Sequence, residues 1–252
     1  MLSLVDWHER YSQQAGWTAG LRRYIFNQLQ IHSSSRWLEV GCGTGAVLQE
    51  LPDPSHQDAG VYGLDIALPA LHFCRKVLPE SWLVCGDAHN LPFARASFDV
   101  IVCHFLLLWL KNPAKAIVEM AAVARPGGYV VVLAEPDYGS RVDFPPAMEA
   151  LGKLQTGALQ KQGADPFIGR RLGRILHQAG LQDIHMGVLG GEWRIGSPRS
   201  TWEGEWKVLT ADLQDQVTPE QLVCFQAADR AAWENGERIL FIPTFYGWGK
   251  VA

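Results

Sequence analysis

Short apolar runs alternate with helical segments between residues 36 and 135, and this rhythm limits the fold more than any other feature of the sequence. Strands that alternate with helices are typical of βαβ units, which form a parallel sheet with helices on both faces. We therefore predict a doubly wound α/β fold. The predicted strands are residues 36–41, 61–65, 82–87, 99–105 and 129–135; the predicted helices are 44–51 (ended by Pro52), 68–78 and 112–124 (ended by RPGG at 125–128).

The flanks of this core have a different character. Residues 7–31 are rich in aromatic side chains and predict one or two helices, which gives an N-terminal helical cap over 1–31. The segment 191–237 is rich in tryptophan, and its TPEQ sequence at 218–221 is a capping box that begins a helix ended by Gly236. We expect a single domain over 1–252, with a core at 36–138 and 191–237 inserted as a lid before the last strand. Further helices are expected near 146–162 and 167–179, and strands at 181–189 and 238–250.

Three alternating glycines follow the first predicted strand, in the sequence GCGTGA at 41–46. They fit the loose dinucleotide-binding pattern G-x-G-x-x-G/A. In that pattern an acidic residue follows about 20 residues later in the sequence, and Asp65 lies at this position. Structural turns between a strand and a helix also collect glycines, so the pattern alone leaves the ligand open.

Three predicted strands end in or near a carboxylate, namely those that carry Glu39, Asp65 and Asp87. The carboxyl ends of parallel strands share the edge where open α/β sheets bind ligands. Three carboxylates would repel a negatively charged pyrophosphate. They would attract a nucleoside that carries a positively charged sulfonium and ammonium group. The alternative is that Asp65 and Asp87 only cap the helices that follow them.

Five segments in this order resemble class I S-adenosylmethionine-dependent methyltransferases, and most closely the small-molecule branch (methyltransferase type 11) with the enzymes of ubiquinone and menaquinone biosynthesis. The resemblance implies a Rossmann-like sheet of seven strands, mostly parallel, with an antiparallel final hairpin, N-terminal helices and a helical insertion before the last strand. It also implies S-adenosylmethionine as the cofactor and S-adenosylhomocysteine as the product. The segments are LEVGCGTG at 38–45, GLDI at 63–66, GDAHNLPF at 86–93, FDVIVCHFLLLWL at 98–110 and RPGGYVVVLAEPDYG at 125–139.

The resemblance implies a site along the glycine turn and the strands that follow. The ribose would bind Asp65, and His104 would face the reacting centre. The N-terminal helix often closes the site in this family, which makes Tyr11, Trp17 and Arg22 candidates. The methionine end of the cofactor would lie over Glu39, Gly41, Cys42, Gly43 and Gly45, and its adenine against Ile66, Asp87 and Ala88.

Methyl transfer from a sulfonium is an in-line displacement that depends mostly on alignment and on exclusion of water. A base is needed only where the acceptor must lose a proton. His104, Glu135, Asp137 and the neighbouring Tyr138 are the candidates, and His104 has a suitable ordinary pKa. The alternative is that His104 is a hydrogen-bonded structural residue.

Two further groups of residues have both functional and structural interpretations. The tryptophans Trp193, Trp202, Trp206 and Trp233 either line an apolar acceptor pocket or form a satellite core. The arginines Arg170, Arg171 and Arg174 could meet an acidic substrate, but we interpret them as a solvated helix face.

The net charge of −4, with 22 basic and 26 acidic residues and no basic run, argues against nucleic-acid binding. The longest apolar run, 100–110, is too short to span a membrane, and Asp6 and Glu9 argue against a signal peptide. Five cysteines without a C-x-x-C pair indicate neither a disulfide framework nor a metal site. We expect a cytoplasmic monomer or homodimer that acts on a small molecule. An NAD(P)-dependent dehydrogenase and a non-catalytic S-adenosylmethionine-binding protein are the alternatives.

Overall fold

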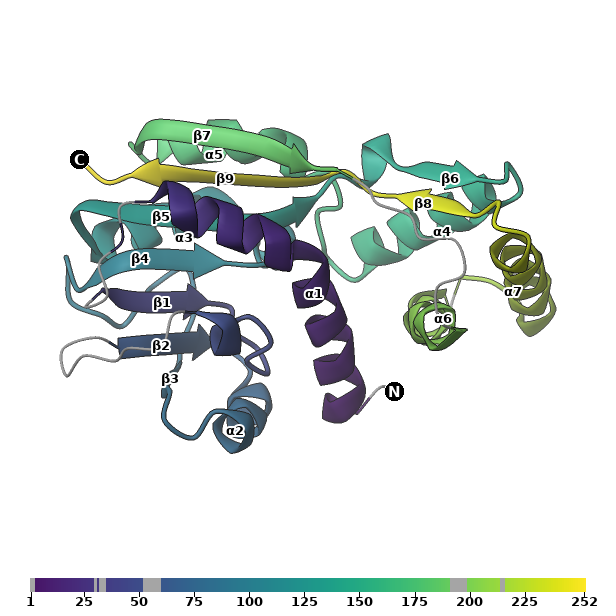
Figure 1. Ribbon diagram of the computed structural model, residues 1–252, viewed down its shortest axis with the longest axis horizontal. Helices are drawn as coiled ribbons and strands as arrows, with labels where there is room; N and C mark the ends of the chain where they lie inside the picture. Colours follow the sequence, from purple (N-terminus) through teal and green to yellow (C-terminus); the bar gives the residue numbers. More distant parts are fainter. Residues whose placement is uncertain (1–2, 30, 32–34, 52–59, 191–198, 214–215) are drawn as a thin grey trace.

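The computed structural model describes residues 3–29, 31, 35–51, 60–190, 199–213 and 216–252, and a seven-stranded sheet forms its centre (Figure 1). The strand order is β3-β2-β1-β4-β5-β9-β7, and β9 is antiparallel to both of its neighbours while the other pairs are parallel. The predicted doubly wound, mostly parallel sheet is confirmed. The strands are β1 (Arg36–Val40), β2 (Gly60–Asp65), β3 (Trp82–Cys85), β4 (Phe98–Cys103), β5 (Ala124–Pro136), β7 (Gln182–Leu189) and β9 (Thr244–Lys250).

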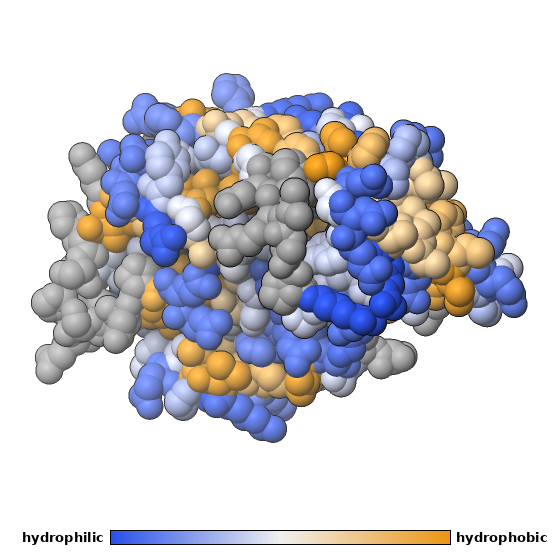
Figure 2. Space-filling view, turned by 45° about the vertical axis from the view of Figure 1, so that its right-hand side comes forward, coloured by the Kyte–Doolittle hydropathy of each residue, from blue (hydrophilic) through white to orange (hydrophobic). Residues whose placement is uncertain are grey.

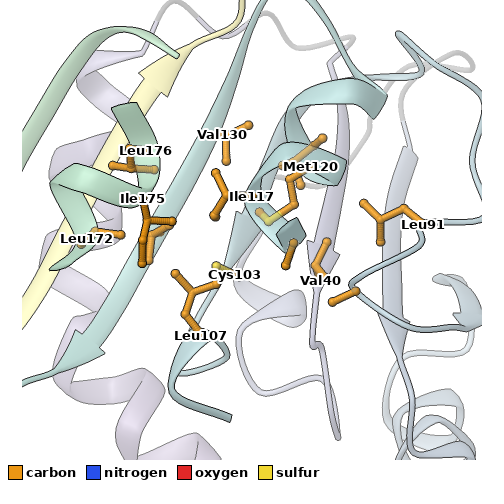
Figure 3. Packing of buried hydrophobic residues seen from close by; sticks show 14 of the residues in the cluster. Val40, Leu91, Cys103, Leu107, Ile117, Met120, Val130, Leu172, Ile175 and Leu176 are labelled. Carbon is orange, nitrogen blue, oxygen red and sulfur yellow. The ribbon is translucent and has the colours of Figure 1, made fainter. Parts of the chain in front are cut away.

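Helices cover both faces of this sheet. On one face Ile117 and Met120 of α3 and Leu176 of α5 pack against sheet residues (Figure 3). On the other face α1 and α2 pack against side chains of β4 and β5 that point the opposite way. Consecutive residues of β5 thus enter different clusters, Val130 one and Val131 the other, as a strand buried on both faces requires. These helices are α1 (Leu4–Gln28), α2 (Leu68–Val77), α3 (Pro113–Val123) and α5 (Leu172–Gln178).

The N-terminal segment forms one helix rather than two. Ser3 begins α1 through a capping box with Asp6, which also accepts a hydrogen bond from the Ser3 backbone. Figure 1 shows one half of α1 against the sheet and the other half beyond the carboxyl ends of the parallel strands. The cap predicted over 1–31 therefore reaches the edge where ligands bind.

The helix predicted over 44–51 is wrong in the described part of that segment. Only a short 3-10 helix, η1 (Leu48–Glu50), forms there. The three glycines before it have positive φ angles of 77°, 50° and 87°, which break the helical backbone, so the chain runs through turns instead. Pro52, predicted to end the helix, lies outside the described residues.

The final strand predicted over 238–250 is also wrong, because the chain divides into two strands that join different sheets. Pro243 lies between them and cannot donate to a strand ladder. The strand β9 completes the large sheet, whereas β8 (Ile239–Phe241) pairs with β6 (Val142–Phe144) in a separate two-stranded sheet.

The RPGG segment at 125–128 was predicted as a turn before the fifth strand, and this boundary is wrong as well. The strand β5 begins at Ala124, because Ala124 pairs with Phe98 and a register shift follows before the ladder resumes at Val100. Gly127 takes the positive φ angle of 79° inside this irregular stretch.

A second, smaller core lies beyond the carboxyl ends of the parallel strands (Figure 1). It is built from α4 (Met148–Lys161), α6 (Arg199–Leu213) and α7 (Pro219–Glu234), and the last begins at the predicted Thr218–Gln221 capping box. Trp202 and Trp206 are buried here, and Trp233 packs at the border. Trp202 and Trp206 thus belong to a satellite core, while Trp193 lies outside the described residues.

The surface carries hydrophobic residues in several small patches among hydrophilic ones on the face seen in Figure 2. Such scattered apolar residues are ordinary for a folded domain. In the part of the chain that the structure describes, no helix is both long enough and apolar enough to cross a membrane.

One buried carboxylate holds the smaller core together, and this generates a first prediction. Asp229 accepts hydrogen bonds from the indole N–H groups of Trp202 at 2.7 Å and Trp206 at 2.6 Å, and from Arg238 at 2.6 Å. Asp229→Ala leaves both indole N–H groups buried without an acceptor, while Arg238 keeps its ion pair with Glu205. We therefore expect the free energy of unfolding to fall by about 2–4 kcal/mol in urea denaturation.

The matched control is Glu234→Ala on the same helix, where an exposed pair with Arg230 is removed. We expect this change to alter the free energy of unfolding by less than about 0.5 kcal/mol. Equal effects of the two substitutions would show that the Asp229 cluster does not stabilise the smaller core.

Candidate functional site

A cavity of about 420 Å³ opens at the carboxyl ends of the parallel strands. Its walls come from the glycine turn after β1, the segment after β4, and the helices α1, α4 and α6. The large sheet therefore supplies one side of the cavity and the smaller core supplies the other. Ligand sites of open α/β sheets occur at this edge.

The glycine turn is shaped by backbone hydrogen bonds to β2. The Gly41 N–H donates to the Leu64 carbonyl at 2.7 Å, and the Gly43 N–H donates to Asp65 Oδ2 at 2.8 Å. Gly41 has a φ angle of 77°, which residues with a Cβ rarely adopt, and an added Cβ would also displace the Leu106 side chain, 2.7 Å away. Gly41, Cys42 and Gly43 line the cavity, and this part of the predicted site is present.

Asp65 lines the same cavity at the end of β2. Its Oδ1 accepts a hydrogen bond from the Ala67 N–H at 2.8 Å, while Oδ2 is held by Gly43 as described. Each carboxylate oxygen keeps a second lone pair, and the two together can accept both hydroxyls of a ribose. The adjacent Ile66 is 72 % exposed, which leaves an apolar side chain uncovered beside this carboxylate.

Glu39 is the most unusual group in the cavity, because its side chain is 2 % exposed and its Oε2 has no hydrogen-bond partner among the described residues. Burial raises the pKa of Glu39 well above its ordinary value, and the nearby Cys74 adds to this. A buried acceptor without a donor is costly, and a cationic ligand group would remove that cost. The residues present thus fit a ligand that is positive at the glycine turn and carries a ribose.

The helix α1 closes the cavity through some of its predicted residues and not others. Tyr11 lines the cavity and stacks on Trp7 with ring centroids 5.6 Å apart. Trp17 lies outside the cavity, under the guanidinium of Arg10 at 4.9 Å from its ring centroid. Arg22 is buried below the cavity, where it forms an ion pair with Glu50.

His104 lines the cavity, and its Nε2 lies 3.0 Å from Thr18 Oγ1. Burial lowers the pKa of His104 to about 3, and the positive charge of Arg22 contributes. The ring is therefore neutral at neutral pH but accepts protons weakly, which disfavours the predicted role as general base.

Glu135 and Asp137 have structural partners that account for their carboxylates. Glu135 is buried, with Oε1 accepting from the Leu106 and Leu107 N–H groups at 3.0 and 2.7 Å and Oε2 from Leu108 at 3.1 Å. This geometry holds the chain after β4 in place. The catalytic role of Glu135 stays a prediction that this geometry does not favour.

Asp137 is buried as well and accepts two hydrogen bonds from Arg170, at 2.6 and 2.7 Å. Its catalytic role also stays a prediction. Arg170, Arg171 and Arg174 are all exposed, as interpreted from the sequence, and Arg170 in addition forms a bidentate ion pair with this buried carboxylate. Arg171 pairs with Asp165.

Four other predicted ligand residues, Gly45, Ile66, Asp87 and Ala88, do not line the cavity. Asp87 is exposed and its Oδ1 pairs with His89 at 2.7 Å, and Ala88 is buried in the main core. Gly45 allows close packing instead, since a Cβ there would lie 2.7 Å from Cys74 Sγ. Their contacts with the cofactor remain predictions from the family resemblance.

Comparison with known proteins agrees with this geometry. A model described as a methyltransferase domain matches residues 38–132, which include the glycine turn, Asp65 and His104. Over these residues the chain is therefore similar to a methyltransferase domain. S-adenosylmethionine as the predicted cofactor agrees with that family.

The relatives of this methyltransferase domain are similar over only part of their length. The biotin biosynthesis bifunctional protein BioHC of Cellvibrio japonicus is 33% identical over 65% of this chain and 32% of that protein. The demethylmenaquinone methyltransferase of Renibacterium salmoninarum is 34% identical over 49% of this chain and 52% of that enzyme. The chain thus spans about a third to a half of the length of these two relatives.

Solved structures agree with the methyltransferase fold. The cyclase SpnF has a TM-score of 0.56 at 20% identity, with 91% of this chain and 80% of SpnF covered. At this identity the likeness concerns the fold alone, and the same fold evidently serves different reactions.

The side of the cavity opposite the glycine turn contains residues that the sequence did not single out. They come from α1, α4 and α6, which are far apart in the chain. The only sequence signal is on α1, where residues 7, 10, 11 and 14 follow the spacing of one helix face. The residues are Trp7, Arg10, Gln14, Gln155, Leu159, Gln162, Val208 and Asp212.

The buried Glu135 at the end of β5 generates a prediction about pH. Burial raises its pKa from 4.5 to about 8, against the effect of the three N–H groups. Between these values the folded protein holds a proton that the unfolded chain has lost, so the free energy of unfolding falls as the pH rises. We expect a fall of a few kcal/mol between pH 5 and 8 in urea denaturation.

The comparison variant is Glu135→Gln, which cannot ionise. Its overall stability is expected to be lower, but this part of the pH dependence should be absent. A wild-type slope that persists unchanged in the variant would assign the slope to other groups.

A third prediction concerns the charge of His104. Because its pKa is about 3, we expect its ring signals in nuclear magnetic resonance to stay unchanged between pH 5 and 8. The signals are assigned by their loss in His104→Gln. A midpoint near 6.5 would contradict the burial argument and restore His104 as a candidate base.

Proposed function

We propose that this chain transfers a methyl group from S-adenosylmethionine to an oxygen, nitrogen or carbon atom of a small-molecule acceptor. The observation that carries the proposal is the buried, unpartnered Oε2 of Glu39 in the same cavity as the glycine turn and Asp65. This arrangement suits a nucleoside with a cationic amino acid end. It does not suit a dinucleotide, whose pyrophosphate would add negative charge beside a buried carboxylate.

Each residue of the cofactor side has a distinct role in this proposal. Glu39 binds the cationic end, Asp65 binds the ribose, and Gly41 allows the ligand to approach the backbone. When bound, S-adenosylmethionine supplies an electrophilic methyl group on its sulfonium. The chain contributes alignment and a dry environment, and the apolar Phe105 and Leu106 line the cavity beside His104.

His104 serves in this proposal as a neutral hydrogen-bonding group. Thr18 contacts its Nε2, so the ring has a fixed orientation in the cavity wall. Such a group can orient an acceptor without taking its proton. Replacement of His104 is therefore expected to lower turnover while cofactor affinity stays near that of the wild type.

The same proposal includes the class of partner, the cellular location and the oligomeric state of the chain. The chain acts on a small molecule rather than a nucleic acid, which is consistent with its net charge of −4. All five cysteines are free thiols, which supports a cytoplasmic location. We expect a monomer or homodimer in solution.

Calorimetric titration with S-adenosylmethionine, S-adenosylhomocysteine and NAD⁺ tests the cofactor. We expect Asp65→Ala to weaken binding of both sulfur compounds by about 30-fold or more, because the ribose loses a charged acceptor. The surface variant Glu234→Ala is the control and should bind as the wild type does. Binding of NAD⁺ alone would favour the dehydrogenase, and binding without any turnover would favour a sensor.

Glu39 adds a proton signature to the same titration. Its raised pKa means that a cationic ligand should expel a proton on binding, so the binding enthalpy should depend on the ionisation enthalpy of the buffer. Glu39→Gln should abolish that dependence. An identical buffer dependence in wild type and variant would remove Glu39 from the cationic subsite.

A further inference from the structure

The side of the cavity formed by α1, α4 and α6 is polar and charged. We call this side, together with Tyr138 after β5 and Gln162 just after α4, the acceptor wall. It comprises Arg10, Tyr138, Gln155, Gln162 and Asp212. It contains one guanidinium and one carboxylate, and it is separate from the glycine turn and Asp65. Because the proposed function places the cofactor at the glycine turn, the acceptor wall faces the space left for the second substrate.

Arg10 lacks a carboxylate partner within the described part of the chain. Its Nη1 donates to Gln13 Oε1 at 3.0 Å, and its guanidinium stacks on Trp17. Burial lowers the pKa of Arg10, and electrostatic interactions with Tyr138, Glu205 and Asp212, in that order, partly oppose this. A guanidinium has five N–H donors, so most of them remain for a ligand.

Asp212 is held only by neutral amides in the same described residues. Gln155 and Gln162 donate to its two carboxylate oxygens at 3.4 Å each, which is long for a hydrogen bond to a charged group. Burial raises the pKa of Asp212, as expected where water is scarce and no cation is bound to it. Its oxygens therefore have room for a stronger donor.

Opposite charges that line one cavity without pairing to each other are expected to be bridged by a ligand. The usual alternative, a direct ion pair, is not formed, since no contact within 4.0 Å joins Arg10 to Asp212. Around them Trp7, Leu159 and Val208 supply apolar surface for the body of a small molecule. The pattern of a few placed polar groups on an apolar lining is typical of sites for small ligands.

We propose that the methyl acceptor is a small hydroxy or amino acid, whose carboxylate binds Arg10 and whose O–H or N–H group donates to Asp212. When that oxygen or nitrogen takes the methyl group from the sulfonium, the carbon–sulfur bond breaks, the O–H or N–H proton passes to Asp212, and neutral S-adenosylhomocysteine is the other product. The proposal rests on the proposed function for its place beside the cofactor. Arg10 suits a carboxylate because its planar fork matches the two oxygens. The same cavity of about 420 Å³ also has to hold the cofactor, so the acceptor must be a compact molecule.

The test is a ligand-binding screen by saturation-transfer nuclear magnetic resonance, with and without S-adenosylhomocysteine. The probes are matched trios on small aromatic and aliphatic skeletons: a hydroxy or amino acid, its primary amide, and the acid without the hydroxyl or amino group. We expect the first member of a trio to bind at least about tenfold more tightly than either relative. Equal binding across the trios, or no binding by any hydroxy or amino acid, would overturn the proposal.

Two variants assign the two contacts separately. Arg10→Met should abolish the preference for acid over amide and keep the preference for the hydroxyl or amino group. Asp212→Asn should do the reverse. If both preferences survive in either variant, that residue does not bind the acceptor.

The control Arg230→Met removes an exposed arginine on α7, outside the cavity, and should keep both preferences. Loss of either preference in this control would show that the discrimination does not arise at the acceptor wall.

Cofactor binding separates this proposal from the proposed function. S-adenosylhomocysteine affinity is measured by calorimetry in every variant and should stay within about threefold of the wild type, since neither change touches the glycine turn. If S-adenosylhomocysteine binds but the trios show no discrimination, the acceptor assignment fails and the proposed function stands. If the hydroxy acids bind through Arg10 and S-adenosylhomocysteine does not bind, the proposed function fails instead.

Discussion

The hydrogen bond from the Gly43 N–H to Asp65 joins the glycine turn to the end of the neighbouring strand, and the cavity is arranged around it. The Gly41 N–H donates to the carbonyl of Leu64, the residue before Asp65, so hydrogen bonds hold the turn to two consecutive residues of β2. Both contacts require glycine backbone angles that other residues rarely adopt. The same turn brings Glu39 to the cavity floor without a donor for its Oε2. A cationic nucleoside is the ligand class that such a floor accommodates.

The helix α1 depends on this floor and in turn completes the site. His8 Nδ1 lies 2.9 Å from Thr44 Oγ1, Arg22 pairs with Glu50, and Thr18 contacts His104. These polar contacts run along one face of the helix and attach it to loops of the sheet. The helix thereby places Tyr11 at the cofactor side and Arg10 at the acceptor wall. Because the cyclase SpnF has a similar fold, the fold alone does not determine the reaction. The reaction depends on the side chains that line the cavity.

The sequence predicted the large sheet well because its signals are local. Buried strands are continuous apolar runs, and the Asn112 cap with Pro113 begins α3 at the residue expected. The helix predicted over 44–51 failed because positive φ angles at the glycines outweighed the helical spacing of the apolar residues. The single final strand failed because the apolar pattern continues across Pro243, although the partners on its two sides belong to different sheets. The residues on the cofactor side were predicted mainly from the family resemblance. That reasoning also selected Trp17, which lies outside the cavity.

By itself the sequence determined the βαβ order, the glycine turn and the carboxylates that follow the strands, since each depends on residues close together in the chain. For the tryptophans of 191–237 it left a pocket lining and a satellite core open, and it did not show that Trp202 and Trp206 share Asp229. Only the tertiary structure decided that Arg10 and Asp212 face one cavity. These residues are far apart in the chain, on α1 and α6, and the packing that brings them together leaves no local sequence pattern. The tertiary structure also decided the weak basicity of His104, since a pKa follows from burial and neighbouring charge rather than from residue type.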